Sequence, residues 1–195
     1  MAQVSSICVY CASSTKIDQA YVDTAKELGV LLAEKNIACI NGAGKMGLMG
    51  AVSDATLQNK GRVVGVIPRF MVDNGWFHVS LSELHVTETM HERKQKMAEL
   101  ADGCIALPGG IGTLEELIEV ITWKQLGLYN KPIVILNTKN YYDLLLQLLK
   151  RMADEKFMRP MHTELWAVAQ TPAEAIRLIE EAEAWPDNYG KFAAL

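Results

Sequence analysis

Long apolar runs, metal-ligand motifs and excess positive charge are all missing from this chain of 195 residues. No window approaches the ~18 apolar residues of a membrane span, and the start, Met1-Ala2-Gln3-Val4, lacks the pattern of a secretion signal. The formal net charge of −4 offers no broad basic surface for a nucleic-acid backbone. These absences predict a cytoplasmic protein that binds a small molecule and contacts neither membranes nor nucleic acids.

Histidine and cysteine are scarce, with four of each. The histidines show neither His-Glu-x-x-His spacing nor any pairing with cysteines, so we expect no metal site. Apolar segments typical of strands contain Cys8, Cys11, Cys39 and Cys104. The Cys8-x-x-Cys11 spacing is compatible with redox or zinc chemistry, but a strand points these two side chains to opposite faces. We therefore expect all four cysteines to pack in the core.

Hydrophobic periodicity predicts that strands and helices alternate along the chain. Strands are expected at 4–11, 37–41, 62–67, 84–87, 103–107 and 132–136. Helices are expected at 17–35, 47–59, 91–101, 113–126, 141–155 and from Thr171 to about Ala184, while 70–84 is typical of a loop or lid. The pattern predicts an α/β fold in which 1–195 form one domain, with a doubly wound, mostly parallel, Rossmann-like sheet and helices on both faces.

The segment from Pro108 to Glu116, Pro-Gly-Gly-Ile-Gly-Thr-Leu-Glu-Glu, joins an apolar strand to a helix through a glycine turn. Its glycines let an anion approach the backbone amides, and the free N–H groups of a helix start favour phosphate. A structural interpretation is also open, because Thr113 fits a helix N-cap whose capping box is completed by Glu116. The two interpretations are compatible.

Two other loops are expected beside this glycine turn. Loops that follow parallel strands meet at one edge of the sheet, so 12–14, 41–47 and 108–113 are predicted to line one cleft. Residues 42–47 also fit the G-x-G-x-x-G pattern of dinucleotide-binding loops, but no acidic residue ends the next strand to bind a ribose. We therefore expect no cofactor. Arg93 and Lys94, near the start of the helix that leads into the glycine-loop strand, add local positive charge.

Several segments together resemble one known family. They are Ile7 to Ser14, Gly42-Ala43-Gly44 with Gly47-Leu48-Met49-Gly50, Val66-Ile67-Pro68, Met90 to Lys94, Pro108 to Glu116, Ile121-Thr122-Trp123 and Lys131-Pro132. In this order they resemble the LONELY GUY (LOG) family of cytokinin riboside 5′-monophosphate phosphoribohydrolases. The resemblance implies cleavage of a purine nucleoside 5′-monophosphate to free base and ribose 5-phosphate, by a homodimer with its site near the subunit interface.

The resemblance also implies roles for individual residues. Glu116 would stabilise the positive charge that develops on the ribose and activate water, ahead of Glu115 on the same helix. Arg93 would bind phosphate or the departing base, with Lys94 as a weaker point charge. The further substrate-binding candidates are Ser13, Gly42, Gly44, Met90, Gly109, Gly110, Ile111, Gly112, Thr113, Leu114, Glu115 and Thr122.

Three departures from the family pattern leave the base open. Asn41 and Ala43 stand where the family usually has tyrosine and glycine, and Gly75 stands near the position of a substrate-contacting glutamate in plant-type members. Both AMP and an N6-prenylated AMP are expected substrates, the second requiring an apolar pocket. Two rival functions remain: a lysine decarboxylase, which needs a pyridoxal phosphate lysine, and a nucleotide sensor that binds without cleaving.

Overall fold

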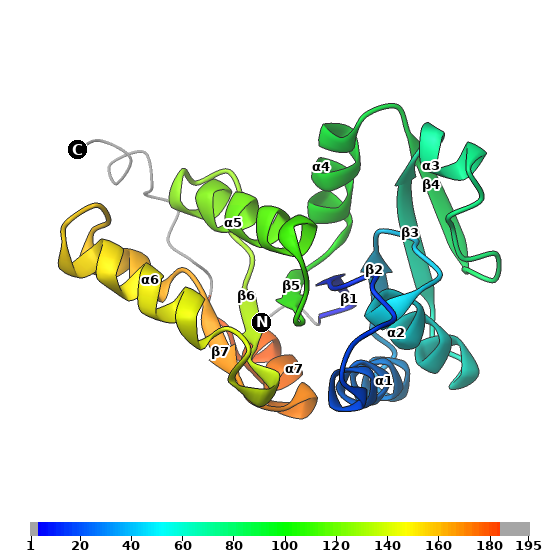
Figure 1. Cartoon of the computed structure of the whole chain (residues 1–195), viewed down its shortest axis with the longest axis horizontal. Helices are drawn as coiled ribbons and strands as arrows, with labels where there is room; N and C mark the ends of the chain where they lie inside the picture. Colours follow the sequence, from blue (N-terminus) through cyan, green and yellow to red (C-terminus); the bar gives the residue numbers. More distant parts are fainter. Residues whose placement is uncertain (1–3, 184–195) are drawn as a thin grey trace.

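The computed structural model describes residues 4–183, and in this part of the chain seven parallel strands form one sheet (Figure 1). Their order is β4-β3-β2-β1-β5-β6-β7. The strands are β1 (Ser6–Tyr10), β2 (Ala38–Asn41), β3 (Val63–Pro68), β4 (Glu83–Thr87), β5 (Gly103–Ala106), β6 (Ile133–Leu136) and β7 (Ala167–Ala169). The predicted α/β fold is confirmed, and all six strand pairings are parallel.

Helices cover both faces of the sheet, as Figure 1 shows. Helices α1 (Gln19–Glu34), α2 (Gly47–Gln58) and α7 (Pro172–Glu180) bury their apolar residues in one core layer. Helices α4 (Met90–Leu100), α5 (Ile111–Gln125) and α6 (Asp143–Asp154) pack on the other layer. Successive side chains of β1 point to opposite faces of the sheet, so Ile7 and Val9 lie in the first core layer and Cys8 and Tyr10 in the second. All four cysteines are buried and free, as expected.

Several short elements escaped the sequence analysis. They are helix α3 (Arg69–Asp73), strand β7 and the 3-10 helices η1 (Thr138–Asn140) and η2 (Pro160–Glu164). Each has at most five residues, too few for a hydrophobic period to show. The last helix begins as predicted, with the Thr171 side chain accepting from the N–H of Glu174, and ends at Glu180. Ala184 and the first three residues lie outside the described part.

The predicted start of α5 is wrong. The helix begins at Ile111, with Gly110 as an N-cap that offers no side-chain bond, so Thr113 is already inside the helix. The expected capping box of Thr113 and Glu116 does not form, because Thr113 is not the N-cap residue and the Glu116 carboxylate pairs with Arg93. The earlier start places the N–H groups of three residues, 111–113, at the helix end, where they lack intrahelical acceptors.

The sheet has a topological switch point between β1 and β5. From β1 the chain adds strands outward through β2, β3 and β4, and then returns to place β5 on the opposite side of β1. Loops leaving the two central strands therefore diverge and open a crevice at the carboxyl edge, where open α/β sheets bind ligands. No helix among residues 4–183 is both long and apolar enough to cross a membrane.

Candidate functional site

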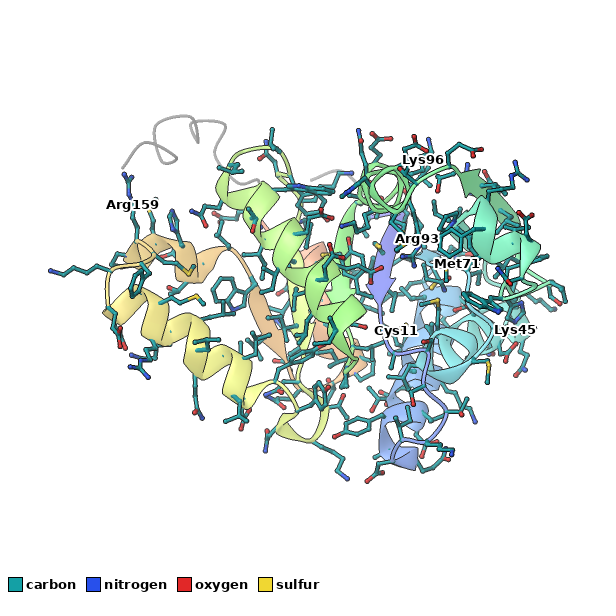
Figure 2. The ribbon with its side chains drawn as sticks, turned by 45° about the horizontal axis from the view of Figure 1, so that its top comes forward. Cys11, Lys45, Met71, Arg93, Lys96 and Arg159 are labelled. Atoms are coloured by element: carbon teal, nitrogen blue, oxygen red, sulfur yellow. The ribbon has the colours of Figure 1, made fainter. Side chains whose placement is uncertain are left out.

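A pocket of about 660 Å³ opens at the switch point. The loops after β1, β2 and β5 line it together with residues from α3, α4 and α5, and Figure 2 shows Cys11, Lys45, Met71 and Arg93 around it. Its lining residues are Cys11, Ala12, Ser13, Ser14, Gly42, Gly44, Lys45, Met46, Met49, Met71, Trp76, Arg93, Gly110, Ile111, Gly112, Thr113 and Glu116. The three loops predicted to converge therefore do so.

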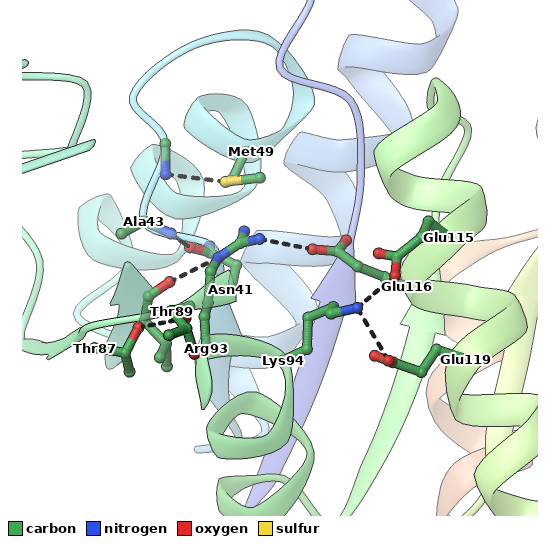
Figure 3. Close-up of polar contacts among 12 residues, drawn as sticks. Asn41, Ala43, Met49, Thr87, Thr89, Arg93, Lys94, Glu115, Glu116 and Glu119 are labelled. Atoms are coloured by element: carbon green, nitrogen blue, oxygen red, sulfur yellow. Dashed lines mark hydrogen bonds and ion pairs between the residues drawn. The ribbon is translucent and has the colours of Figure 1, made fainter. Parts of the chain in front are cut away.

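A buried ion pair between Arg93 and Glu116 lines this pocket. Arg93 Nη1 donates to Glu116 Oε1 at 3.0 Å, and Arg93 Nε donates to the carbonyl of Val66 at 3.1 Å (Figure 3). Both charged residues are less than a tenth exposed, at 6% and 8%. Burial raises the pKa of the Glu116 carboxyl above its ordinary value, and the neighbouring guanidinium opposes that shift without cancelling it. A raised pKa makes this carboxylate a better proton acceptor than an ordinary glutamate.

Gly42 leaves the space that the Arg93 guanidinium occupies. A Cβ atom on Gly42 would lie 1.8 Å from Arg93 Nη2 and 2.9 Å from its Cζ. The turn that contains Gly42 is held by Asn41, whose Oδ1 accepts from the N–H of Ala43 at 2.9 Å and whose Nδ2 donates to Ser53 at 2.9 Å. Ala43 itself has a φ of 62°, so this position retains a glycine-like conformation with alanine in place.

Lys94 lies between helices α4 and α5 and does not line the pocket. Its Nζ contacts Glu115 and lies 3.0 Å from Glu119 Oε1, so it ties α4 to one face of α5 (Figure 3). Burial lowers the pKa of Lys94, but the hydrogen bonds to these carboxylates outweigh it and the net pKa is raised. Of the two adjacent carboxylates on α5, Glu116 points to the pocket and Glu115 is engaged with Lys94.

Apolar side chains form another part of the pocket lining. Met46, Met49, Met71 and Trp76 line it, with Met46 and Trp76 about half exposed at 51% and 52%. The segment that bears Trp76 is fixed to the β2 loop by Lys45 Nζ, which donates to the Gly75 carbonyl at 2.8 Å, and by the bridge between Gly44 and Phe77. The predicted loop or lid over 70–84 thus contains most of helix α3 and the start of strand β4, and it contributes Met71 and Trp76 to the pocket.

The sequence-derived candidates divide into two groups. Those that line the pocket are Ser13, Gly42, Gly44, Arg93, Gly110, Ile111, Gly112, Thr113 and Glu116. Those that do not line it are Met90, Lys94, Gly109, Leu114, Glu115 and Thr122. The Thr122 hydroxyl donates to the Ile118 carbonyl one turn back. Met71 also lines the pocket and was not predicted, because α3 is too short to show a hydrophobic period and no sequence motif connects it to the glycine loops.

Comparison with known proteins places this arrangement in a family. A family model described as "Possible lysine decarboxylase" matches residues 49–179. The cytokinin riboside 5′-monophosphate phosphoribohydrolase LOG7 of Arabidopsis thaliana is 42% identical over 177 residues, covering 91% of this chain and 82% of that protein. LOG3 of the same plant is 41% identical over 175 residues, covering 90% and 81%. The chain belongs to the LOG family.

The LOG assignment agrees with the fold. The molybdenum cofactor binding protein of Rippkaea orientalis superposes with a TM-score of 0.70 at 22% identity, covering 92% of this chain and 97% of that one. At this identity the likeness shows the fold alone. The family model and the LOG relatives confirm the family resemblance read from the glycine loops and the Met90 to Lys94 segment, and the roles of individual residues in this chain are proposals. No group of three metal-ligating side chains is found among the described residues.

Proposed function

We propose that this chain hydrolyses the N-glycosidic bond of purine nucleoside 5′-monophosphates to free base and ribose 5-phosphate. The observation that carries the proposal is the buried Arg93–Glu116 pair, which lines the same pocket as the amide-rich start of α5. A phosphate site and an ionisable carboxylate in one cavity are what this reaction requires. The LOG relatives, at about 40% identity over nine-tenths of the chain, support the reaction class.

The 5′-phosphate binds at the start of α5 in this proposal. The N–H groups of Ile111, Gly112 and Thr113 have no intrahelical acceptor, and the positive end of the helix dipole favours an anion there. Gly110 and Gly112 carry no side chain, and a Cβ at either would meet no atom within 4 Å, so the backbone is open to a ligand. Thr113, inside the pocket, adds a hydroxyl.

Glu116 acts on the ribose in the proposed reaction. As the C1′–N9 bond breaks, its electron pair leaves with the base and positive charge builds on the ring, which the Glu116 carboxylate stabilises. A water molecule then bonds its oxygen to C1′ and gives one proton to Glu116, and Glu116 passes this proton through solvent to the departing base, which restores the carboxylate. Arg93, held by Val66 and Glu116, supplies fixed positive charge for the phosphate or for the leaving base.

The base contacts the apolar lining in this proposal. Met46, Met49, Met71 and Trp76 offer surface for an aromatic ring and for an apolar N6 substituent. Lys45, adjacent to Met46, also lines the pocket, and its ammonium donates to the Gly75 carbonyl. We therefore expect both AMP and N6-isopentenyl-AMP to be substrates.

Quaternary structure, domain organisation and location are further parts of the proposal. We propose a homodimer with the pocket near the subunit interface, one domain over 1–195, and a cytoplasmic location. Exposed apolar residues on the helices that line the pocket, Ile111 at 82% and Ile118 at 39% on α5 and Met90 at 39% on α4, offer surface for a second copy. Sedimentation equilibrium of the purified chain tests the dimer, and a monomer at micromolar concentration contradicts it.

Product analysis tests the reaction. Purified protein is incubated with AMP and with N6-isopentenyl-AMP, and products are resolved by chromatography beside Glu116→Gln and Arg93→Ala. Release of free base by the wild type, lost in both variants, supports the proposal and ranks the two bases. Nucleotide that stays intact while bound overturns catalysis and favours the sensor, whereas release of carbon dioxide from lysine with pyridoxal phosphate favours the decarboxylase named by the family model.

A further inference from the structure

Every carbonyl group that leads from β5 into α5 already has a donor. The hydrogen bonds run from Tyr142 Oη to Leu107 at 2.7 Å, Ala12 N to Pro108 at 3.3 Å, Tyr141 Oη to Gly109 at 2.6 Å and Leu114 N to Gly110 at 3.0 Å. By contrast, the amides of 109–113 donate to no group in the part of the chain described. The loop therefore offers unused donors while its acceptors are occupied, which is the polarity of an anion-binding nest.

Tyr141 fixes the orientation of one peptide unit in this loop. The carbonyl of Gly109 and the N–H of Gly110 belong to the same planar trans peptide, so they point in opposite directions. Holding the Gly109 oxygen therefore aims the Gly110 N–H, and Gly110 lines the pocket. Glycine on both sides of this peptide removes the steric barrier that would otherwise restrain its rotation.

The corner before α6 places Tyr141 rigidly. Lys139 and Asn140 have φ values of 56° and 58°, so two consecutive non-glycine residues adopt the left-handed conformation. The Tyr141 ring then packs edge-on between Tyr21, at a centroid distance of 5.9 Å, and Tyr142, at 5.0 Å. The hydroxyl is thus presented to Gly109 by a side chain packed on two sides.

We propose that Tyr141 is a positioning residue for phosphate recognition, acting through the Gly109–Gly110 peptide. This inference rests on the proposed function, because it assigns the start of α5 to the 5′-phosphate. Without the hydroxyl, the peptide rotates and exposes a carbonyl oxygen to the phosphate for part of the time. We expect affinity to fall for ligands that carry the phosphate, while contacts to the ribose and base stay unchanged.

Tyr142 provides a matched control in the next residue. Its hydroxyl holds the Leu107 carbonyl, but the nitrogen of that peptide belongs to Pro108, which has no N–H to aim at a ligand. Tyr142→Phe removes a buried hydroxyl and lowers the melting temperature without reorienting a phosphate donor. Tyr141→Phe removes a hydroxyl from a side chain that is 44% exposed and folds normally.

Calorimetric titration of ribose 5-phosphate into the full-length chain tests the inference. Tyr141→Phe is expected to weaken binding about five- to tenfold, the effect of one hydrogen bond, while Tyr142→Phe binds as the wild type does. The kcat/KM for AMP should fall by the same factor in Tyr141→Phe, with that for adenosine unchanged. Equal affinity of Tyr141→Phe and wild type, or equal losses in both variants, overturns the positioning role.

The binding measurement separates this inference from the proposed reaction. Ribose 5-phosphate binding needs no turnover. If the wild type binds it, Tyr141→Phe weakens that binding and no base is ever released, only the proposed reaction is refuted. If the wild type binds ribose 5-phosphate and Tyr141→Phe leaves the affinity unchanged, only the positioning role is refuted. If the wild type does not bind ribose 5-phosphate, both the proposed function and the positioning role are refuted.

Discussion

Replacing Gly42 with alanine should disable the pocket without replacing a charged residue. The new Cβ would lie 1.8 Å from Arg93 Nη2, whereas ordinary contacts begin at 3.4 Å, so the guanidinium must move by about 1.6 Å (3.4 − 1.8). The bond from Arg93 to Glu116 is 3.0 Å long, and a contact of about 3.6 Å is no longer a hydrogen bond. The required movement of the guanidinium exceeds this margin, so we expect the bond to break. Misplacement by about 1 Å costs roughly 10²-fold in rate.

Steady-state release of base from AMP measures this effect. We expect kcat/KM to fall about 10²-fold in Gly42→Ala, and the free energy of unfolding to fall by about 1.5–3 kcal/mol for the lost charge-assisted bond. The acid limb of the pH–rate profile should move to higher pH, because Glu116 loses the guanidinium that opposes the burial-driven rise of its pKa.

Gly29→Ala is the control for stability alone. Its Cβ would meet the Val52 carbonyl at 2.5 Å, at the contact of α1 with α2 and away from the pocket. This variant should melt at a lower temperature and keep wild-type kcat/KM below its melting range. Wild-type kcat/KM and an unmoved acid limb in Gly42→Ala would refute the reasoning.

Four further outcomes are expected. Glu116→Gln should lose at least about 10²–10³ in kcat yet bind ribose 5-phosphate in calorimetry. In the wild type, a pH–rate profile should show activity lost as pH falls through a Glu116 pKa above the ordinary 4.5, because the ionised carboxylate is the active form. Lys94→Met, which unties Glu115 and Glu119, should cost about 1–2 kcal/mol in urea unfolding, less than a fully buried pair because Glu115 is half exposed. Trp76→Ala should raise KM for N6-isopentenyl-AMP more than for AMP, and equal changes would remove Trp76 from the base site.

The parallel sheet and the convergence of its loops could be predicted because both follow from periodic signals. Residues such as Leu114, Leu117 and Ile121 repeat at the helical period, and alternation of strands with helices limits the topology to a few choices. The three loops were then placed together by the rule that parallel strands open at one edge. Glu116 and Arg93 also line this pocket, but they are helix residues whose roles were expected from the family resemblance and not from this rule.

Local pairings could not be predicted from the same signals. Thr113 and Glu116 have the spacing of a capping box, but a buried guanidinium 23 residues away competes for the carboxylate and wins. Lys94 looked like a phosphate ligand because it is adjacent to Arg93, yet neighbouring helix residues face different directions and it meets Glu115 and Glu119 instead. Such outcomes depend on tertiary contacts that no local pattern encodes.

The most direct test of the central claim follows AMP and the purified chain by ³¹P NMR, with the free base measured by chromatography in the same sample. We expect the AMP resonance to be replaced by that of ribose 5-phosphate, with one adenine released for each and no inorganic phosphate. Adenosine with inorganic phosphate, or AMP that stays unchanged, would contradict hydrolysis of the N-glycosidic bond at the Arg93–Glu116 pocket.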